Sequence, residues 1–415
     1  MTTNASYAYF RIRDESFAER VLLLSKRTMP LNRKLRFGMV GGGPGAFIGA
    51  VHRRAATMDG LATLVAGSFS SDRAKSRAQG EELHLDAERV YDSYQAMAER
   101  EASLSPDERI DFVSIVTPNH LHFPIARAFI ERGIHVICDK PMTTTLADAE
   151  ALSRLVQQHD VVFALTHNYS GYPLVKQARA MVRRGELGQI RKIVVEYSQG
   201  WLSTRIEATG QKQADWRTDP ARAGAGALGD IGSHAEHLAR YVTGLEIEQL
   251  CADVSTFVEG RRIDDDANIL VRYRGGAKGV LFCSQISVGE ENRLSLRVYG
   301  TDASLEWHQQ EPNALIVRRA DGPMQVYKPG HPFLDEAATH ATRLPSGHPE
   351  AFFEAFANVY ANAMRTIAAR LAGETADPLD LDFPTVQDGV AGVRFILGAV
   401  ASGERADWFD FAQGS

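Results

Sequence analysis

The feature that most restricts the fold of this chain is a run of glycines between an apolar strand pattern and a helical pattern. Residues 35–40 form a short apolar run, residues 41–45 are Gly-Gly-Gly-Pro-Gly, and a helical pattern covers residues 46–57. Glycines at such a junction permit a tight turn and let a pyrophosphate group approach backbone N–H groups at a helix start. The strict G-x-G-x-x-G spacing fails, because residue 46 is alanine and Gly49 comes three positions late. We therefore predict a nucleotide-binding turn lengthened by about three residues, the alternative being a flexible surface turn.

Strand and helix patterns alternate from this turn to about residue 165. Such alternation implies right-handed βαβ units and a parallel sheet covered by helices on both faces. We assign residues 34–165 to a Rossmann dinucleotide-binding domain, and residues 1–33 to an N-terminal extension that includes a short helix. The remaining expected strands are residues 61–66, 89–91, 112–116, 135–138 and 161–165, and the remaining expected helices are residues 72–83, 94–101, 122–132 and 146–159.

A different pattern begins near Thr166, as expected for a chain of 415 residues, which is too long for one ordinary core. Several segments alternate apolar and polar residues and are separated by turn signals, which predicts a largely antiparallel open sheet. Residues 166–415 are therefore expected to form an α+β domain. Its expected strands are residues 190–199, 247–257, 267–273, 279–287 and 293–299, and its expected helices are residues 173–184, 227–243, 350–370 and 385–402.

Composition excludes several classes of function. The net charge is −6 and no basic stripe is visible, which argues against nucleic acid as a partner. The three cysteines, Cys138, Cys251 and Cys283, have neither disulfide-framework nor zinc-site spacing, so reduced buried thiols are expected. No apolar run approaches the length of a membrane span, and the run at residues 21–24 is too short for a signal sequence. We therefore expect a cytoplasmic location and no membrane contact.

The region after the second strand bears on the choice of nicotinamide cofactor. NAD-binding domains often carry an acidic residue here that binds the ribose 2′-hydroxyl. No acid directly follows this strand; Ser68 and Arg73 lie in a serine-rich stretch that could receive a 2′-phosphate. Asp72 could instead rotate into reach of the ribose. We expect NAD(P) as cofactor, with NADP slightly favoured over NAD.

Residues 136–143 read VICDKPMT and raise a separate question. A buried strand here runs directly into Asp139, Lys140 and Pro141. A desolvated lysine is costly unless a negative or polar group faces it. Either Lys140 forms a simple surface pair with Asp139, or it faces a ligand.

Two further motifs accompany this stretch. The fourth strand is followed by Thr117-Pro118-Asn119-His120-Leu121-His122, and Gly229-Asp230-Ile231-Gly232-Ser233-His234 stands further on. Together the three motifs closely resemble the Gfo/Idh/MocA family of sugar and cyclitol oxidoreductases, from Leu35 almost to the end of the chain. The sequence departs from the family pattern at Asp139, where glutamate is usual, and in the lengthened glycine turn.

The resemblance implies a catalytic role for Lys140, which lies between nicotinamide and substrate in this family and hydrogen-bonds a substrate hydroxyl. Asp230 and His234 are four positions apart on an expected helix, which places them on one face. Alcohol oxidation needs a base at the hydroxyl, and we assign this role to His234, with Asp230 as its partner and as a substrate ligand. His237 continues the face, but helical spacing alone does not make a zinc site, so no metal is expected.

The remaining roles follow from the glycine turn, the strand ends and the resemblance. By the resemblance, residues 117–119 and His122 are expected to border the nicotinamide ribose, and residues 168–169 and 216–217 to contact a sugar. The expected cofactor-binding residues are Gly41, Gly43, Gly45, Ser68, Arg73, Thr117, Pro118, Asn119, His122, Asp139 and Lys140, and the expected substrate-binding residues are Lys140, Asn168, Tyr169, Trp216, Arg217, Asp230 and His234.

The resemblance implies hydride transfer between a secondary hydroxyl of a sugar, anhydrosugar or inositol and a nicotinamide cofactor. Two alternatives share the architecture: an NAD-dependent glycosidase that works by transient oxidation, and a non-catalytic nucleotide-sensing regulator. A homodimer or homotetramer is also expected, because one face of the second sheet would otherwise expose apolar residues. By rough parity, we place Val254, Leu270, Val280 and Leu281 on that face.

Overall fold

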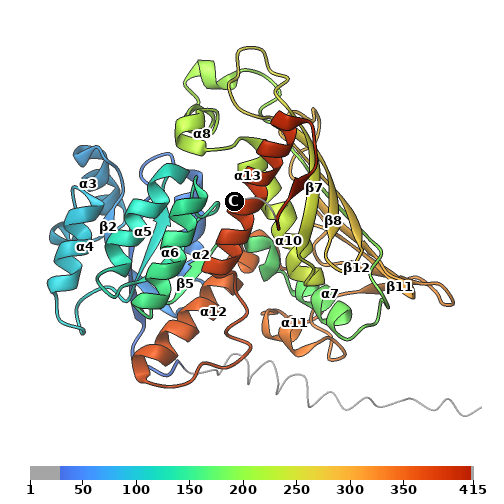
Figure 1. Cartoon of the computed structure of the whole chain (residues 1–415). Helices are drawn as coiled ribbons and strands as arrows, with labels where there is room; N and C mark the ends of the chain where they lie inside the picture. The colour runs from blue at the N-terminus through green and yellow to red at the C-terminus, as the bar shows by residue number, and fades with distance from the viewer. Residues whose placement is uncertain (1–28, 413–415) are drawn as a thin grey trace, which may run out of the picture.

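The structure, a computed structural model, describes residues 29–412. Figure 1 shows two units, each built on its own β-sheet, with long helices from the end of the chain between them. Most of the expected N-terminal extension, including its helix, lies outside the described residues. In the part that is described, Arg33 forms an ion pair of 2.7 Å with Asp111 and so joins the start of the chain to the first unit.

The first unit is a parallel sheet of five strands in the order β2-β1-β3-β4-β5. Every residue of the strand Phe112–Val116 is buried, as expected for a parallel strand covered on both faces. The predicted Rossmann architecture is confirmed. The elements are β1 (Leu35–Gly41), α2 (Phe47–Thr57), β2 (Ala62–Ser68), α3 (Arg73–Glu82), α4 (Tyr94–Ser103), β3 (Phe112–Val116), α5 (His122–Ile130), β4 (His135–Cys138), α6 (Leu146–Gln158) and β5 (Phe163–Leu165).

Two helices from the end of the chain complete the cover of this sheet. On one face, α12 (Phe352–Ala372) packs with α2, and its residues Phe356 and Tyr360 join the core around β1. On the other face, α13 (Val386–Arg405) contributes Val386 and Val393 to the core around α5 and α6. The expected division at residue 165 therefore separates the two sheets. Helices α12 and α13, however, come after this division in the chain and pack on the first sheet.

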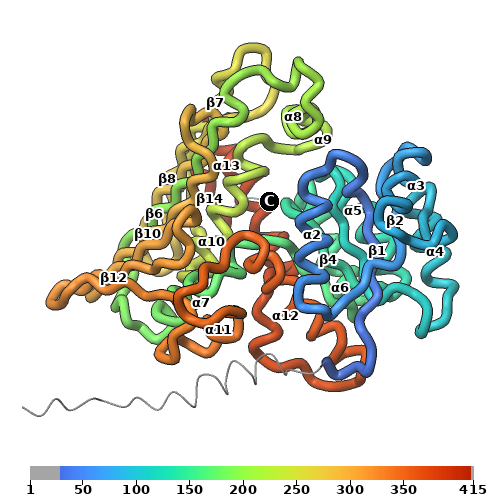
Figure 2. The backbone as a smooth tube through the Cα atoms, turned by 180° about the vertical axis from the view of Figure 1, so that it is seen from behind, coloured from blue at the N-terminus to red at the C-terminus, as the bar shows by residue number. Residues whose placement is uncertain are grey.

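The second unit is a sheet of nine strands in the order β13-β12-β11-β10-β6-β9-β8-β7-β14. Only the pairing of β6 with β9 is parallel among these described strands, so the mostly antiparallel sheet is confirmed. Figure 2 shows the sheet from behind, with its helices on the side that faces the first unit. The strands are β6 (Lys192–Ser198), β7 (Ile247–Ser255), β8 (Asp266–Tyr273), β9 (Lys278–Ser284), β10 (Arg293–Tyr299), β11 (Ala303–His308), β12 (Leu315–Arg319), β13 (Gln325–Tyr327) and β14 (Phe409–Asp410).

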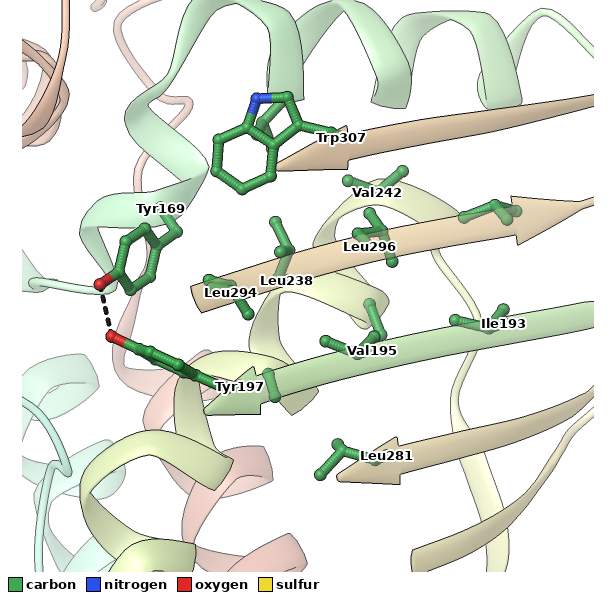
Figure 3. Packing of buried hydrophobic residues seen from close by; sticks show 14 of the residues in the cluster. Tyr169, Ile193, Val195, Tyr197, Leu238, Val242, Leu281, Leu294, Leu296 and Trp307 are labelled. Carbon is green, nitrogen blue, oxygen red and sulfur yellow. Dashed lines mark hydrogen bonds between the residues drawn. The ribbon is translucent and has the colours of Figure 1, made fainter. Parts of the chain in front are cut away.

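The inner face of this sheet holds a core against α7 (Pro173–Arg183) and α10 (Ser233–Thr243). Figure 3 shows Val195, Leu296 and Leu281 on three neighbouring strands, with Leu238 of α10 in the same packed cluster. The short helices of this unit are α8 (Lys212–Arg217), α9 (Pro220–Ala223) and α11 (Glu336–His340), with 3-10 turns at Ile206–Thr209 and Asn168–Gly171.

The faces of the sheet correct part of the sequence prediction. Leu281 is 2% exposed in the inner core, and Val254 packs against the same core, so both face the helices. Leu270 is 52% exposed and lies opposite Val280 in the register of β8 with β9, so these two are on the outer face. The parity estimate failed for Leu281 because it directly follows Val280, and successive side chains of a strand point to opposite faces. It failed for Val254 because this residue shares its face with the buried Leu250 and Ala252.

Some local elements also differ from expectation. The brief strand expected at residues 89–91 is a single bridge between Val90 and Gly67. The single helix expected at residues 227–243 begins as a π-helical turn, Leu228–Gly232, and continues as α10. Strands β11 to β14 were not predicted from the sequence; β12, β13 and β14 have five residues or fewer. Within residues 29–412, no helix is long and apolar enough to cross a membrane.

Candidate active site

A cleft of about 680 Å³ lies at the carboxyl ends of the parallel strands. This is where ligands bind in open α/β sheets, and the volume falls within the usual range for small-molecule sites. The opposite wall comes from the second unit, including residues 212–217. The predicted site residues that line the cleft are Gly41, Gly43, Ser68, Thr117, Pro118, Asn119, Asp139, Lys140, Trp216, Arg217 and Asp230.

The glycine turn forms one end of this cleft. Gly41 and Gly42 have positive φ angles of 88° and 72°, a conformation that side chains disfavour. A Cβ atom at Gly43 would lie 2.7 Å from the carbonyl oxygen of Phe69, and one at Gly49 would collide with Gly42. Glycine is therefore required for the turn and for the close packing of α2, and the turn lies open to the cleft. These properties fit the pyrophosphate of a dinucleotide.

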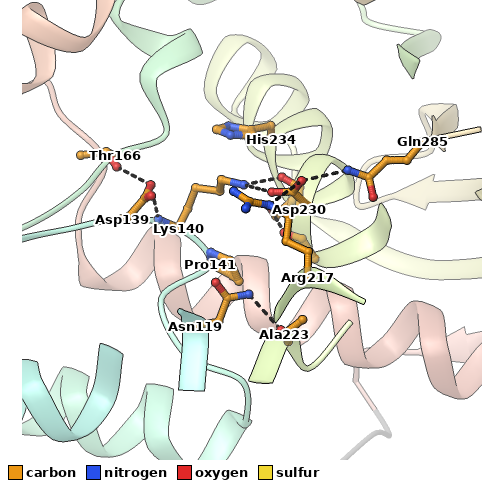
Figure 4. Close-up of polar contacts among 12 residues, drawn as sticks. Asn119, Asp139, Lys140, Pro141, Thr166, Arg217, Ala223, Asp230, His234 and Gln285 are labelled. Atoms are coloured by element: carbon orange, nitrogen blue, oxygen red, sulfur yellow. Dashed lines mark hydrogen bonds and ion pairs between the residues drawn. The ribbon is translucent and has the colours of Figure 1, made fainter. Parts of the chain in front are cut away.

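Lys140 lies at the inner end of the cleft. Its contacts decide whether it pairs with Asp139 at the surface, the alternative left open for the VICDKPMT stretch. Its Nζ donates to Asp230 Oδ1 at 2.8 Å and to the carbonyl oxygen of Asp230 (Figure 4). Asp139 does not pair with the lysine side chain; its Oδ1 instead accepts from the backbone N–H of Lys140 and from Thr166 Oγ1. The surface-pair alternative is therefore wrong, because the lysine crosses to a carboxylate of the second unit.

Asp230 accepts hydrogen bonds from more than one side of the cleft. Gln285 Nε2 donates to its Oδ2 at 2.9 Å, and Arg217 Nε lies 3.4 Å from the same oxygen (Figure 4). Burial raises the pKa of the Asp230 carboxyl group, but the charges of Lys140 and Arg217 more than offset this and hold that pKa well below its ordinary value. Asp230 is therefore a carboxylate throughout the neutral range.

The π-helical turn Leu228–Gly232 presents this carboxylate. The backbone N–H of Ser233 donates to the carbonyl oxygen of Leu228, five residues earlier, and Ser233 Oγ donates to the carbonyl oxygen of Gly229. Single π-helical turns inside helices are rare and frequent at functional sites. Here the turn lies directly before α10 and leaves the carbonyl oxygen of Asp230 as an acceptor for Lys140.

His234 lies behind the Lys140–Asp230 pair and is 7% exposed (Figure 4). Among the described residues, its ring is not hydrogen-bonded to Asp230, the partner that the sequence predicted. Its Nδ1 lies instead within hydrogen-bond distance, 3.5 Å, of His167 Nδ1. Burial and the charge of Lys140 lower the pKa of His234 well below its ordinary value, against the opposing effect of Asp230. His234 is thus a neutral imidazole at neutral pH.

Six predicted site residues do not line the cleft: Gly45, Arg73, His122, Asn168, Tyr169 and His234. The ring nitrogens of buried His122 face the carbonyl oxygens of Pro141 and Thr117, so this residue ties the loops after β3 and β4 together. Arg73 is exposed to solvent, and its Nε lies 3.2 Å from Asp92 Oδ2.

The two residues of the predicted 168–169 pair are buried beside the cleft. The hydroxyl groups of Tyr169 and Tyr197 are hydrogen-bonded to each other at 2.6 Å, and Asn292 Nδ2 donates to Tyr169. The Tyr169 ring also contacts His234, with ring centroids 4.8 Å apart. Asn168 is buried, and its Nδ2 has no hydrogen-bond partner among the described atoms. Tyr169 therefore packs against His234 rather than facing the cleft directly.

Residues 206–223, here called the crossing segment, reach from the second unit over the glycine turn. Lys212 Nζ donates to the carbonyl oxygen of Pro44 at 2.9 Å, and Asn119 Nδ2 donates to the carbonyl oxygen of Ala223 at 2.9 Å. Figure 2 shows α8 and α9 of this segment above the end of α2. The predicted Trp216 and Arg217 belong to it, and the Arg217 guanidinium lies over the Trp216 ring. The crossing segment therefore closes the cleft on the side away from the parallel sheet.

Several cleft residues escaped the sequence analysis. Asp92 lines the wall next to Ser68, and the strand-end rule applied to residues 89–91 would have found it. Lys212, Gln285 and His167 reach the site only through tertiary contacts, and no local pattern marks Lys212 or Gln285. Across residues 29–412, no group of three or more His, Cys, Asp or Glu side chains is placed to hold a metal ion.

The Rossmann sheet, the glycine turn and a lysine held by a carboxylate of the second unit together define a nicotinamide-dependent oxidoreductase architecture. Residues 35–167 match the oxidoreductase family with an NAD-binding Rossmann fold, and residues 175–306 match the GFO/IDH/MocA C-terminal domain. This chain belongs to the Gfo/Idh/MocA oxidoreductase family, as its motifs predicted.

Individual relatives agree with this assignment. An oxidoreductase of known structure from Sinorhizobium meliloti is 46% identical, with a TM-score of 0.82 and coverage of 91% of this chain and 99% of that one. An inositol dehydrogenase homolog from Azotobacter vinelandii, solved in complex with NAD+, is 37% identical, with a TM-score of 0.87 and coverage of 92% and 99%. Levoglucosan dehydrogenase from Pseudarthrobacter phenanthrenivorans is 28% identical over 331 residues, which cover 72% of this chain and 82% of that protein.

Proposed function

We propose that this protein transfers a hydride between a secondary hydroxyl of a sugar, anhydrosugar or inositol and a nicotinamide dinucleotide. The observation that carries the proposal is the ion pair of Lys140 with Asp230 at the inner end of the cleft, with the buried His234 next to it. The relatives named above support a polyhydroxylated substrate, since one is a levoglucosan dehydrogenase and another is an inositol dehydrogenase homolog. A structure of the latter also contains NADH and myo-inositol.

The cleft residues fit a dinucleotide, which supplies the hydride acceptor when bound. The glycine turn offers backbone N–H groups to the pyrophosphate, and Ser68 lies at the end of β2, where a ribose binds in this fold. Thr117 and Asn119 lie at the end of β3, toward Lys140. Gly41, Gly43 and Asp139 complete the proposed cofactor site, whereas His122 acts through the two loops that it joins.

Lys140 and His234 have different roles at the reacting hydroxyl: Lys140 donates a hydrogen bond and His234 transfers the proton. A lysine ammonium group has three N–H donors. Two of those of Lys140 point to Asp230, which leaves one for a substrate oxygen. His234 accepts the hydroxyl proton on a ring nitrogen when an alcohol is oxidised, and returns it when a ketone is reduced. Trp216 and Arg217 are placed in the cleft wall to contact the rest of the substrate.

We further propose that the cofactor is NAD in preference to NADP. The sequence favoured NADP because Ser68 and Arg73 could receive a 2′-phosphate. Arg73 is held by Asp92 outside the cleft, whereas the Asp92 carboxylate lines the wall near Ser68. The Asp92 carboxylate can accept a hydrogen bond from a ribose 2′-hydroxyl. While it is paired with Arg73, it also keeps that guanidinium from binding a 2′-phosphate.

The two alternative functions, an NAD-dependent glycosidase and a nucleotide-sensing regulator, would give different products from a dehydrogenase. None of the relatives named above is a glycosidase or a regulator. The test is a panel of sugars, anhydrosugars and inositols incubated with purified protein and NAD or NADP. Steady NADH production with at least one of them is expected. A glycosidase would cleave a glycoside without net NADH formation, and a nucleotide sensor would bind the cofactor and turn over nothing; either result would refute the proposal.

A substitution tests the role of Lys140 within the same assay. Lys140→Met removes the donor and the charge while roughly keeping the volume. Because general acid–base and polarising groups contribute on the order of 10²–10⁴ in rate, a loss of that size in turnover is expected. Dinucleotide binding, followed by fluorescence titration, should be mostly retained. Lys34→Met, an exposed lysine before β1, is the matched control.

Assembly and location stay predictions. The outer face of the nine-stranded sheet carries the exposed apolar residues Leu270, Tyr299 and Val326. We propose that this face packs against a second copy of the chain in a homodimer or homotetramer, because a broad apolar sheet face is unusual on a monomer. The cytoplasmic location rests on the sequence and on the three cysteines, which are all free.

A further inference from the structure

The His234 ring has a fixed neighbour on its Nδ1 side. His167 lies two positions after the end of β5, and its Nδ1 lies 3.5 Å from His234 Nδ1. The two rings meet edge to face, with centroids 5.3 Å apart and an interplanar angle of 84°. The ring of His237 stacks on the ring of His167, with centroids 4.3 Å apart and an interplanar angle of 8°. The orientation of His167 toward the base is therefore set by packing on two rings.

All three imidazoles are neutral at neutral pH. Burial lowers the pKa values of His167 and His234 well below their ordinary range, and it lowers the pKa of His237 to about 3. The positive charge of Lys140 acts in the same direction on His167 and His234. A neutral imidazole carries one N–H donor and one bare acceptor nitrogen. A hydrogen bond between the two facing Nδ1 atoms, which their separation of 3.5 Å allows, requires that one of them donates and the other accepts.

We propose that His167 is a positioning residue that selects the tautomer of His234. In this arrangement His234 Nδ1–H donates to the bare Nδ1 of His167. His234 Nε2 is then left without a proton and can accept one from a substrate hydroxyl. This inference rests on the proposed function for its catalytic meaning, but the tautomer itself is a property of the protein alone. The opposite tautomer would place a proton on Nε2 and leave no base.

The groups around His234 leave this role to His167. Asp230, from the π-helical turn, directs its carboxylate to Lys140 and Gln285. The hydroxyl groups of Tyr169 and Tyr197 are bonded to each other. Within residues 29–412, His167 is thus the hydrogen-bond partner of the His234 ring. An orienting partner behind a catalytic imidazole is the arrangement by which a carboxylate fixes the histidine tautomer in a Ser-His-Asp triad, here with a second imidazole in its place.

The experiment compares three variants of the full chain. His167→Phe keeps a ring that can stack on His237 but removes the acceptor. His167→Asn places an amide oxygen near the position of Nδ1 and can rescue the hydrogen bond. His237→Phe is the matched control, because it changes the stacking partner without touching the Nδ1 contact. Two-bond ¹H–¹⁵N correlation spectra of histidine-labelled protein report which nitrogen of His234 carries the proton, and dinucleotide affinity reports the integrity of the cleft.

We expect His234 to be protonated on Nδ1 in the wild type, in His167→Asn and in His237→Phe, and to lose this preference in His167→Phe. The turnover number for alcohol oxidation should fall about tenfold or more in His167→Phe, since outer partners of a functional histidine commonly contribute 10–100-fold. It should recover largely in His167→Asn, with the KM for NAD unchanged in both.

Two results would overturn the inference: a wild-type His234 protonated on Nε2, or a His167→Phe variant with the wild-type tautomer and turnover. If His167→Phe does not fold, the tautomer and rate of His167→Asn against His237→Phe decide between hydrogen bonding and packing. A protein that oxidises no compound of the panel but shows the tautomer shift would refute the proposed function and leave the His167–His234 relation intact.

Discussion

Lys140 Nζ and Asp230 Oδ1 lie 2.8 Å apart although 90 positions separate the two residues in the chain. The contact joins the loop after β4 of the parallel sheet to the π-helical turn of the second unit. It also sets opposite charges beside one imidazole, because Lys140 lowers the pKa of His234 and Asp230 raises it. The protonation of the proposed base is therefore governed by the two sides of one ion pair, and by burial.

The first prediction concerns the pH dependence of alcohol oxidation. A base with a lowered pKa stays neutral, and competent, at all pH values above that lowered pKa. The acid limb of kcat/KM for the sugar should therefore lie below the ordinary histidine value of about 6.5. Asp230→Asn removes the charge that raises the pKa and should move the limb to still lower pH. Ketone reduction needs the protonated form and should show the opposite trend.

Lys140→Met completes this test in the other direction. It removes a charge that lowers the pKa of His234, so that pKa should rise toward the ordinary value. Since this variant loses most of its turnover, the titration of the His234 ring is followed by NMR.

His234→Ala should lose both reaction directions while dinucleotide binding survives. A wild-type acid limb and rate in His234→Ala would move the role of base to another residue, Lys140 first.

The second prediction concerns the cofactor. Asp92→Asn removes the cleft carboxylate and frees Arg73, whose Nε lies 3.2 Å from it. We expect the wild type to prefer NAD, and Asp92→Asn to bind NADP about tenfold more tightly, which corresponds to roughly 1.4 kcal/mol. NAD should bind more weakly to this variant, because an amide oxygen is a weaker acceptor for the ribose hydroxyl than a carboxylate. Glu81→Gln, an exposed residue of α3 outside the cleft, is the charge-matched control. Dissociation constants for NADH and NADPH measure the effect; a wild type that prefers NADP would contradict it.

Some features of the fold and of the site were predictable from the sequence, and others were not. The parallel sheet and glycine turn were predictable, because periodicity and glycine placement are local properties. The motifs predicted Lys140, Asp230 and His234 as site residues, but they did not predict that His234 contacts His167 rather than Asp230, because that contact forms only in the folded chain. The π-helical turn at Leu228–Gly232 has no signature in helical spacing.

The third prediction concerns the crossing segment. Lys212 is exposed, reaches the carbonyl oxygen of Pro44 in the glycine turn and forms no ion pair among the described residues. A bound pyrophosphate would lie beside this unpaired charge. Lys212→Met should weaken dinucleotide binding about fivefold, a loss on the order of 1 kcal/mol for a solvent-exposed charge pair. The salt dependence of binding should become shallower in this variant. Lys34→Met, at the opposite end of β1, should match the wild type; equal losses in both variants would remove Lys212 from the cofactor site.

The fourth prediction concerns assembly. Leu270 is 52% exposed on the outer face of the nine-stranded sheet. Light scattering at micromolar concentration should give the mass of a dimer or tetramer for the wild type. Leu270→Asp should shift that mass toward the monomer, because it buries a charge in the proposed interface. Leu371→Asp, which alters a leucine 40% exposed on α12, should keep the wild-type mass. A monomeric wild type would show that the outer face is not an interface between copies.

The last prediction concerns stability, and it uses a histidine remote from the cleft. His135 of β4 is 5% exposed, and its Nδ1 accepts a hydrogen bond of 3.0 Å from the backbone N–H of Val162. An accepting Nδ1 cannot carry a proton, and burial lowers the pKa of His135 from 6.5 to about 4. The unfolded chain, with an ordinary histidine pKa, therefore binds this proton at a higher pH than the folded protein does.

The sign of the effect follows from this difference in proton binding. Between about pH 6.5 and 4 the unfolded state binds more protons, so the free energy of unfolding falls as the pH is lowered, by up to roughly 3 kcal/mol for this one residue. His135→Asn offers an amide oxygen as acceptor for Val162 and does not titrate, so its stability should fall less steeply over the same range. Thermal unfolding midpoints of both proteins at a series of pH values measure the two slopes. Because the other buried histidines titrate in both proteins, only the difference between the slopes belongs to His135, and parallel slopes would show that its proton does not contribute to acid instability.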